Sequence, residues 1–313
     1  MNRTAKTAYS VSIILAIVLA LSCVAIRTFL FFAEYDEALG HFAPLSLMND
    51  AFNVLILVSI IAFIIPSVIM RKAKDIRVSY TDIPTLFSTA FLSIALLLFA
   101  IFVLIDASTL QKSGASLFFS VLCFIFALGS IPYYILRICT VKVKSEIYAL
   151  LSIFPILLGC SFAFYFYFDN TMYMNSPVLI LHQVAAMFIA FFALGEARIE
   201  LGRVKWGLYI AVGLTAFTVT LADSLPYLFY IPAAQNVTYA KTAIAFLVFA
   251  FSLYIISRIF AIYALNSRDA EGLITFFKSI YGKKEDADGT EPHAEQLIIN
   301  LSGEENNAQN EQK

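Results

Sequence analysis

Charged residues are scarce in this chain. They make up 14% of its 313 residues, whereas hydrophobic residues make up 60%. A soluble domain has roughly 25% charged and about 45–50% apolar residues. This chain therefore has too little polar surface to cover a fold in water, and the scarcity excludes an ordinary soluble protein.

Residue types that bind metals or form disulfides are also few. The only histidines are His41, His182 and His293, and three scattered histidines do not make the usual multi-histidine metal site. The cysteines fall inside apolar runs or at their cytoplasmic ends, at positions Cys23, Cys123, Cys139 and Cys160. Since none lies in an outer loop, we expect no disulfides and interpret them as small apolar packing residues.

Motifs that carry chemistry are missing as well. The chain contains no H-E-x-x-H, no G-x-S-x-G, no paired aspartates within an apolar run and no P-loop. We therefore expect no cofactor, no metal and no nucleic-acid partner. An enzyme acting on lipid or peptide stays open but has no motif in its favour.

Long apolar runs are what the chain does contain. Each is about twenty residues long, the length that a helix needs to cross a hydrocarbon core of roughly 30 Å. Their apolar character is continuous rather than alternating, which argues against a transmembrane barrel. The sequence predicts an all-α polytopic membrane protein, a bundle of eight transmembrane helices over 9–32, 51–70, 84–105, 117–138, 147–168, 178–197, 206–229 and 242–265.

Basic residues predict the orientation of the bundle. If Arg3 and Lys6 lie in the cytoplasm, the even-numbered turns hold most other arginines and lysines, whereas the opposite face keeps only Arg27, Lys112 and Lys241. This asymmetry is the positive-inside pattern, and it places both termini in the cytoplasm. We expect a multi-pass protein of the cell membrane, in contact with the lipid bilayer.

The first run allows one alternative. Its basic start and apolar core resemble a secretory signal, with Cys23 at the position where a lipoprotein is cleaved. The apolar sequence continues beyond Cys23 as far as Phe32, which favours an uncleaved first span.

The sequence divides into three parts. Residues 1–267 form the predicted transmembrane bundle. Residues 268–284 place Leu273, Phe276, Phe277 and Ile280 at helical spacing beside lysines, which is typical of a helix lying on the inner membrane surface. Residues 285–313 are acidic and poor in aromatics, and they predict a disordered cytoplasmic tail that offers a site for a protein partner.

Three ionisable residues from different spans reach a similar depth near the outer side. Arg27, His182 and Asp223 each lie roughly 8–9 Å inside the end of their span. Charges at membrane depth turn inward and find partners. One hypothesis is that they line a polar pocket open to the outside, together with Gln183. The other is that each is satisfied separately, by headgroups, a helix end or a single interhelical bond.

At the inner side, Glu196 and Glu200 lie one turn apart on one helix. They are interpreted either as a solvated rim or as part of a cytoplasmic gate in which Glu196 pairs with Arg258. Asp106 is placed at an outer span end, where its charge is expected to stay in water. Tyrosines and phenylalanines near the outer boundary are expected to form an interfacial belt, at 165–168, Tyr173, Tyr227 and Tyr230.

These residues favour a permease-like protein for a small solute, in which Arg27, His182, Gln183 and Asp223 form the outer group and Glu196 with Arg258 the inner one. The scarcity of polar residues at mid-depth argues against transport. The alternative is a membrane sensor or complex subunit that acts through its cytoplasmic tail, although no signalling domain is recognisable.

Overall fold

The structure is a computed structural model that describes residues 3–36, 40–43, 46–70, 76, 78, 80, 82–110, 112, 114–139, 145–168, 176–234 and 238–266. The predicted amphipathic segment and acidic tail lie outside these residues. The helices are α1 Arg3–Ala33, α2 Leu47–Met70, α3 Ile83–Thr109, α4 Gly114–Ile138, α5 Ser145–Leu151, α6 Ile153–Tyr167, α7 Pro177–Glu200, α8 Trp206–Tyr230 and α9 Tyr239–Asn266.

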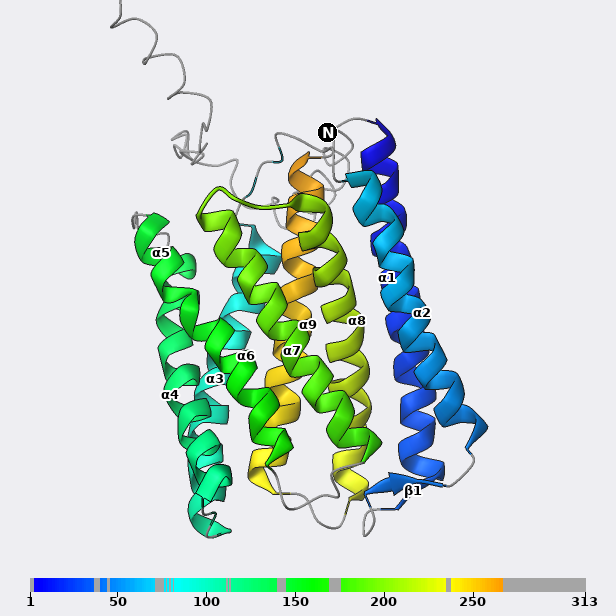
Figure 1. The fold of residues 1–313 in the computed structure, drawn as a ribbon, viewed down its shortest axis with the longest axis vertical. Helices are drawn as coiled ribbons and strands as arrows, with labels where there is room; N and C mark the ends of the chain where they lie inside the picture. The colour runs from blue at the N-terminus through cyan, green and yellow to red at the C-terminus, as the bar shows by residue number, and fades with distance from the viewer. Residues whose placement is uncertain are drawn as a thin grey trace, which may run out of the picture.

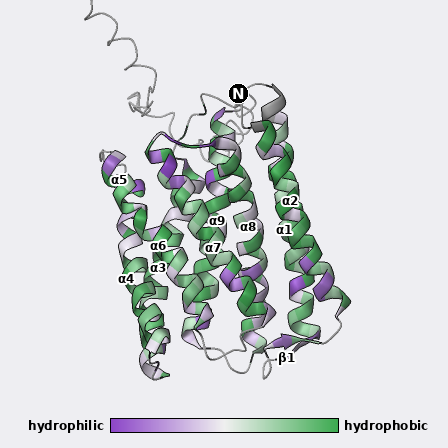
Figure 2. Cartoon of the chain, in the orientation of Figure 1, coloured by the Kyte–Doolittle hydropathy of each residue, from purple (hydrophilic) through white to green (hydrophobic). Residues whose placement is uncertain are grey.

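The prediction of an all-α multi-pass bundle is confirmed. Over the described residues, eight helical stretches are long and apolar enough to cross a membrane. Hydrophobic residues cover the middle of the helices, and hydrophilic ones gather toward the helix ends (Figure 2). Apolar side chains exposed on the outside of the bundle, such as Ile64 and Phe191, are therefore expected to face lipid.

The predicted fifth span is interrupted. It consists of α5 and α6, which are separated at Ser152. Pro155 has no N–H to donate to the carbonyl of Leu151, so the regular helical hydrogen bonding is lost at this point. At the break, the Ser152 hydroxyl donates to the Ala149 carbonyl at 2.6 Å.

Six helices form a closed ring, which is the main feature of the architecture. In order around the ring, each helix packs against the next: α8, α9, α3, α4, α6, α7 and again α8. The α1–α2 pair packs on the outside of α8 and stands at one side of the molecule (Figure 1). Because α8 has neighbours on all sides, it is buried along most of its length, including Thr215, Thr218 and Thr220.

The two ends of the bundle differ. The start of α1 and the end of α9 lie at one end, which we call the N-terminal end (Figure 1). At the other, β1 (Tyr35–Asp36) and β2 (His41–Phe42) form a short antiparallel hairpin in which Tyr35 pairs with Phe42. We call this the hairpin end. The positive-inside pattern predicts that the N-terminal end faces the cytoplasm.

Candidate functional site

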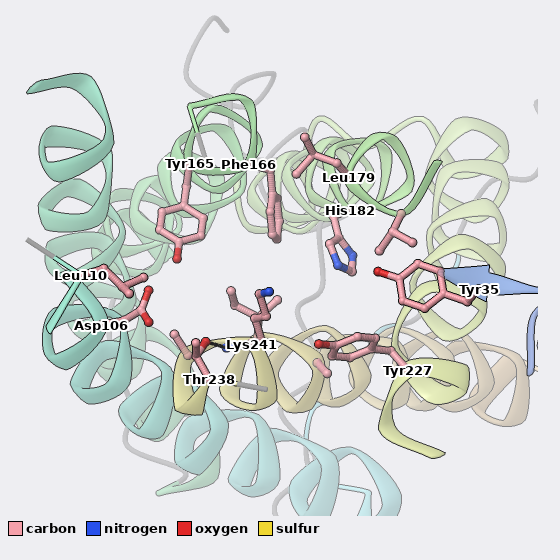
Figure 3. Close-up of a pocket in the computed structure, with 14 residues that line it drawn as sticks. Tyr35, Asp106, Leu110, Tyr165, Phe166, Leu179, His182, Tyr227, Thr238 and Lys241 are labelled. Carbon is pink, nitrogen blue, oxygen red and sulfur yellow. Dashed lines mark hydrogen bonds between the residues drawn. The ribbon is translucent and has the colours of Figure 1, made fainter. Parts of the chain in front are cut away.

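A cavity of about 240 Å³ enters the six-helix ring from the hairpin end. Side chains from α3, α6, α7, α8 and α9 line it, together with Tyr35 of the hairpin. Figure 3 shows His182, Lys241 and the hydroxyls of Tyr35, Tyr165 and Tyr227 directed into it. Polar groups thus converge on a space that apolar residues otherwise enclose, which is the usual character of a small-molecule site.

His182 and Asp223 meet at the wall of this cavity. The Nδ1 atom of His182 lies 2.7 Å from each carboxylate oxygen of Asp223. Because an ionised carboxylate only accepts hydrogen bonds, Nδ1 carries the proton and donates to it. The His182 ring also packs against Phe166, with centroids 4.8 Å apart. The imidazole is therefore held in one orientation.

Arg27 does not line the cavity. Its side chain is 2% exposed, and its guanidinium carbon lies 4.5 Å from the ring centre of Phe42, 4.9 Å from that of Phe52 and 5.4 Å from that of Phe31. These are cation–π contacts, which stabilise an arginine at low exposure. Asp223 interacts with Arg27 electrostatically, so the two predicted charges are near one another, but Arg27 sits behind the wall.

Gln183 is half-buried and does not line the cavity either. Of the four outer residues singled out in the sequence, His182 lines the cavity and Asp223 bonds to it. Arg27 lies behind these two residues. Gln183 follows His182 directly on α7, but it is not part of the lining.

Asp106 corrects one expectation, because its charge does not stay in water. The residue is 8% exposed, lines the cavity and forms an ion pair with Lys112 at 3.0 Å. Lys112 also donates to the hydroxyl of Tyr165 at 3.1 Å. Asp106 is one of the buried residues near the end of α3, so its carboxylate meets a lysine.

Of the predicted aromatic belt, Tyr173 lies outside the described residues, and only some of the other members are at the surface. Tyr167 is half exposed, as an interfacial side chain would be, but Tyr165 and Phe166 are 3% exposed and line the cavity. Tyr227 also lines it. Helix rotation decides between the two surroundings, because neighbouring residues on one helix point in different directions.

A second polar cluster lies inside the ring toward the N-terminal end. Glu196 of α7 is its centre and is 1% exposed. Arg137 of α4 donates to Glu196 at 2.9 Å and to Glu200 at 2.8 Å. Arg258 of α9 lies 3.4 Å from Glu196. Glu196 is thus buried beside Arg258 and does not lie in a solvated rim.

Tyrosines complete this cluster. The hydroxyls of Tyr209 and Tyr254 donate to Glu196, the latter at 3.3 Å, and Tyr80 donates to Glu200 at 2.7 Å. The guanidinium carbons of Arg137 and Arg258 lie 3.9 Å and 3.8 Å from the centre of the Tyr80 ring. Burial raises the pKa of Tyr80 well above its ordinary value, so the phenol stays protonated and donates.

Several members of these two groups are not evident from the sequence, including Tyr80, Tyr209 and Tyr254. Three basic residues are among them: from the sequence alone, Arg137 is only one of the residues that set the orientation, and Lys112 and Lys241 are only basic residues of the outer face. Tyr133 lies one turn before Arg137 on α4 and is hydrogen-bonded to it. The sequence carries no signal of this contact, because tyrosine and arginine are also usual neighbours at a membrane interface.

The described residues hold no candidate metal site. Among the described residues, no three histidine, cysteine, aspartate or glutamate side chains are close enough together to hold an ion. The four cysteines are free thiols, with Cys23 and Cys123 buried and Cys139 and Cys160 exposed.

Comparison of the chain with protein-family models, with curated proteins and with solved structures gave no match. The function is therefore inferred from geometry alone. The two polar groups lie at opposite mouths of one ring, and along α7 the distance from His182 to Glu196 is about 21 Å at 1.5 Å per residue. This arrangement can bind a small solute at one mouth and exclude water at the other.

Proposed function

We propose that this protein is a permease of the cell membrane that moves a small solute through the six-helix ring. One observation carries the proposal: a cavity opens at the hairpin end, and a buried ion-pair cluster closes the opposite mouth of the same ring. In the predicted orientation the cavity opens to the outside and the cluster is a cytoplasmic gate.

The size of the cavity sets the size of the solute. At about 240 Å³ it lies just below the range of roughly 300–1,000 Å³ that holds drug-sized ligands. It therefore suits a molecule no larger than an amino acid or a short organic acid. His182, fixed by Asp223, and the tyrosine hydroxyls supply the directional contacts.

The gate is closed by charged side chains that pair with one another while buried and that water can solvate once the helices separate. Arg137, Glu196, Glu200 and Arg258 come from three different helices, α4, α7 and α9. A small separation of these helices breaks the ion pairs, and entering water then solvates the same charges. Opening is thus favoured by hydration and opposed by the loss of the pairs, as a reversible gate requires.

Cysteine accessibility tests the two-mouth arrangement. Ala245 lines the cavity, and buried Ala193 lies about one turn before Glu196 on α7. In a background with the four cysteines replaced by alanine, Ala245→Cys should react with an impermeant thiol reagent from the hairpin end. Ala193→Cys should react from the N-terminal end only when Glu200→Gln weakens the gate. The proposal is contradicted if the cysteine at 245 does not react. It is also contradicted if the cysteine at 193 reacts equally with and without Glu200→Gln.

Flux through reconstituted protein tests transport itself. Proteoliposomes are assayed for uptake of radiolabelled glycerol, alanine and lactate, with protein-free liposomes as the control. Uptake of at least one solute above the control is expected, and truncation after Gly282 should leave it unchanged. No uptake of any of them overturns transport of this size class. Uptake that disappears with the tail favours the sensor or complex-subunit alternative.

A further inference from the structure

One positively charged group at the cavity has no negatively charged partner in the part of the chain that the structure describes. Lys241 of α9 is half-buried and reaches toward the middle of the cavity (Figure 3). Among the described residues its ammonium group has no carboxylate partner within ion-pair distance. We propose that the cavity binds a small organic anion with one carboxylate, and that the carboxylate pairs with Lys241.

The two acidic side chains nearby do not cancel this charge. Asp106 is paired with Lys112 at 3.0 Å. Asp223 accepts from His182 at 2.7 Å and lies behind it rather than in the lining. Each carboxylate therefore has its own donor, and the ammonium of Lys241 is left as the exposed charge of the cavity.

Two helix N-termini also favour an anion in this cavity. The first turns of α7 and α9 both line the cavity, through Val178 and Leu179 and through Ala240 and Lys241. A helix N-terminus carries a partial positive charge and attracts anions. The first turn of α7 has no side-chain cap, because the Ser176 hydroxyl donates to the Gly40 carbonyl at 2.5 Å. Both dipoles thus add to the field of the lysine.

The apolar part of the lining indicates the chemistry of the rest of the ligand. Phe166, Leu179, Ile244 and Ala245 form apolar parts of the lining. Among the described residues that line the cavity, Lys241 is the only lysine or arginine. One ammonium group beside hydroxyls and apolar surface favours a monocarboxylate with a short hydrocarbon or aromatic part over a dianion.

This inference rests on the proposed function, because it names the substrate class for the same cavity, but binding is measurable without flux. The experiment measures the thermal unfolding of the full-length protein in detergent with butyrate, lactate and benzoate. Each acid is compared with its neutral amide of the same shape. At least one acid should raise the melting temperature in a saturable way, whereas its amide should not.

Lys241→Gln should raise the dissociation constant of that acid at least about tenfold, since a charge-assisted contact is lost. Lys241→Arg should keep most of the affinity because it retains the charge. The matched control is Lys205→Gln, which removes an exposed lysine at the opposite end of the bundle and should change nothing. Unfolding of each variant without ligand shows that it is folded.

Four outcomes separate the possibilities. If the acids raise the melting temperature no more than their amides do, the carboxylate assignment is overturned. The same holds if an acid stabilises Lys241→Gln as much as the unchanged protein. Either result overturns the assignment even if flux of a neutral solute supports transport. Acid binding that depends on Lys241 but comes without any flux supports the assignment and contradicts the permease. Stabilisation by phosphatidylglycerol that is lost in Lys241→Gln, with none by soluble acids, assigns the lysine to a lipid headgroup and overturns the proposal.

Discussion

Glu196 is the residue on which the closed end of the ring depends most. Glu196→Gln keeps the shape of the side chain but removes the charge that faces both Arg137 and Arg258. The two arginines are 6% and 0% exposed, so water does not replace the lost partner. Glutamine also turns an N–H₂ donor toward groups that are themselves donors. The variant should therefore be strongly destabilised.

The magnitude follows from burial. Removing one partner of a buried ion pair costs about 3–5 kcal/mol, because the remaining charge stays uncompensated. Glu200 provides the comparison: it is half-buried, and it accepts from Arg137 at 2.8 Å and from Tyr80 at 2.7 Å. Glu200→Gln should cost less, about 1.5–3 kcal/mol, as for a hydrogen bond to a charged group, because Glu196 still compensates Arg137.

The assay is unfolding in mixed micelles of detergent and dodecyl sulfate, followed by the fluorescence of Trp206. This is the only tryptophan in the chain, and its ring centre lies 6.0 Å from that of Tyr209, so it reports on the cluster. Combining Glu196→Gln with Arg137→Gln should give a coupling energy of about 2–3 kcal/mol. A Glu196→Gln protein as stable as Glu200→Gln, or a coupling near zero, would refute this description of the ion-pair cluster.

Three further changes test other contacts by the same unfolding measurement. His182→Gln and Asp223→Asn should be coupled by about 1–2 kcal/mol, because the imidazole bonds the carboxylate at 2.7 Å; strictly additive losses would show that the contact does not form. Phe42→Leu should cost about 0.5–2 kcal/mol through loss of the cation–π contact of Arg27 at 4.5 Å, and no loss would mean that Arg27 is held by other groups. Gly159→Ala should cost about 1–3 kcal/mol, since its β-carbon would lie 2.8 Å from the backbone nitrogen of Ala190 on α7. The control for this last change is Cys160→Ala at the exposed neighbouring position, and equal effects of the two would contradict close packing of α6 on α7.

The predicted spans agree with the helices to within four residues, except that α1 begins six residues before the first predicted span. The reason for the agreement is local. Crossing the hydrocarbon core requires about twenty apolar residues in succession, and this requirement is visible in the sequence without knowledge of neighbours. The fifth span shows the limit. Its apolar run is continuous, and only Pro155 signals the break at Ser152.

The depth of each polar residue was also predictable, because a helix rises about 1.5 Å per residue. Depth placed His182 and Asp223 at one level, and the structure brings them into contact. It placed Arg27 at that level too, yet Arg27 lies behind the cavity wall among phenylalanines. Depth alone does not say which way a side chain points around its helix.

The sequence by itself determined the surrounding medium, the crossings, their predicted orientation and the level of each charge, because these depend on residues close together in the chain. Only the tertiary structure decided which charges meet. Arg137 bonds to Glu196 across 59 positions, and Lys241 reaches the cavity because α9 lies beside α3 and α8 in the ring. The order of helices around the ring and the rotation of each one are set by packing of all of them together, and no single segment encodes that result.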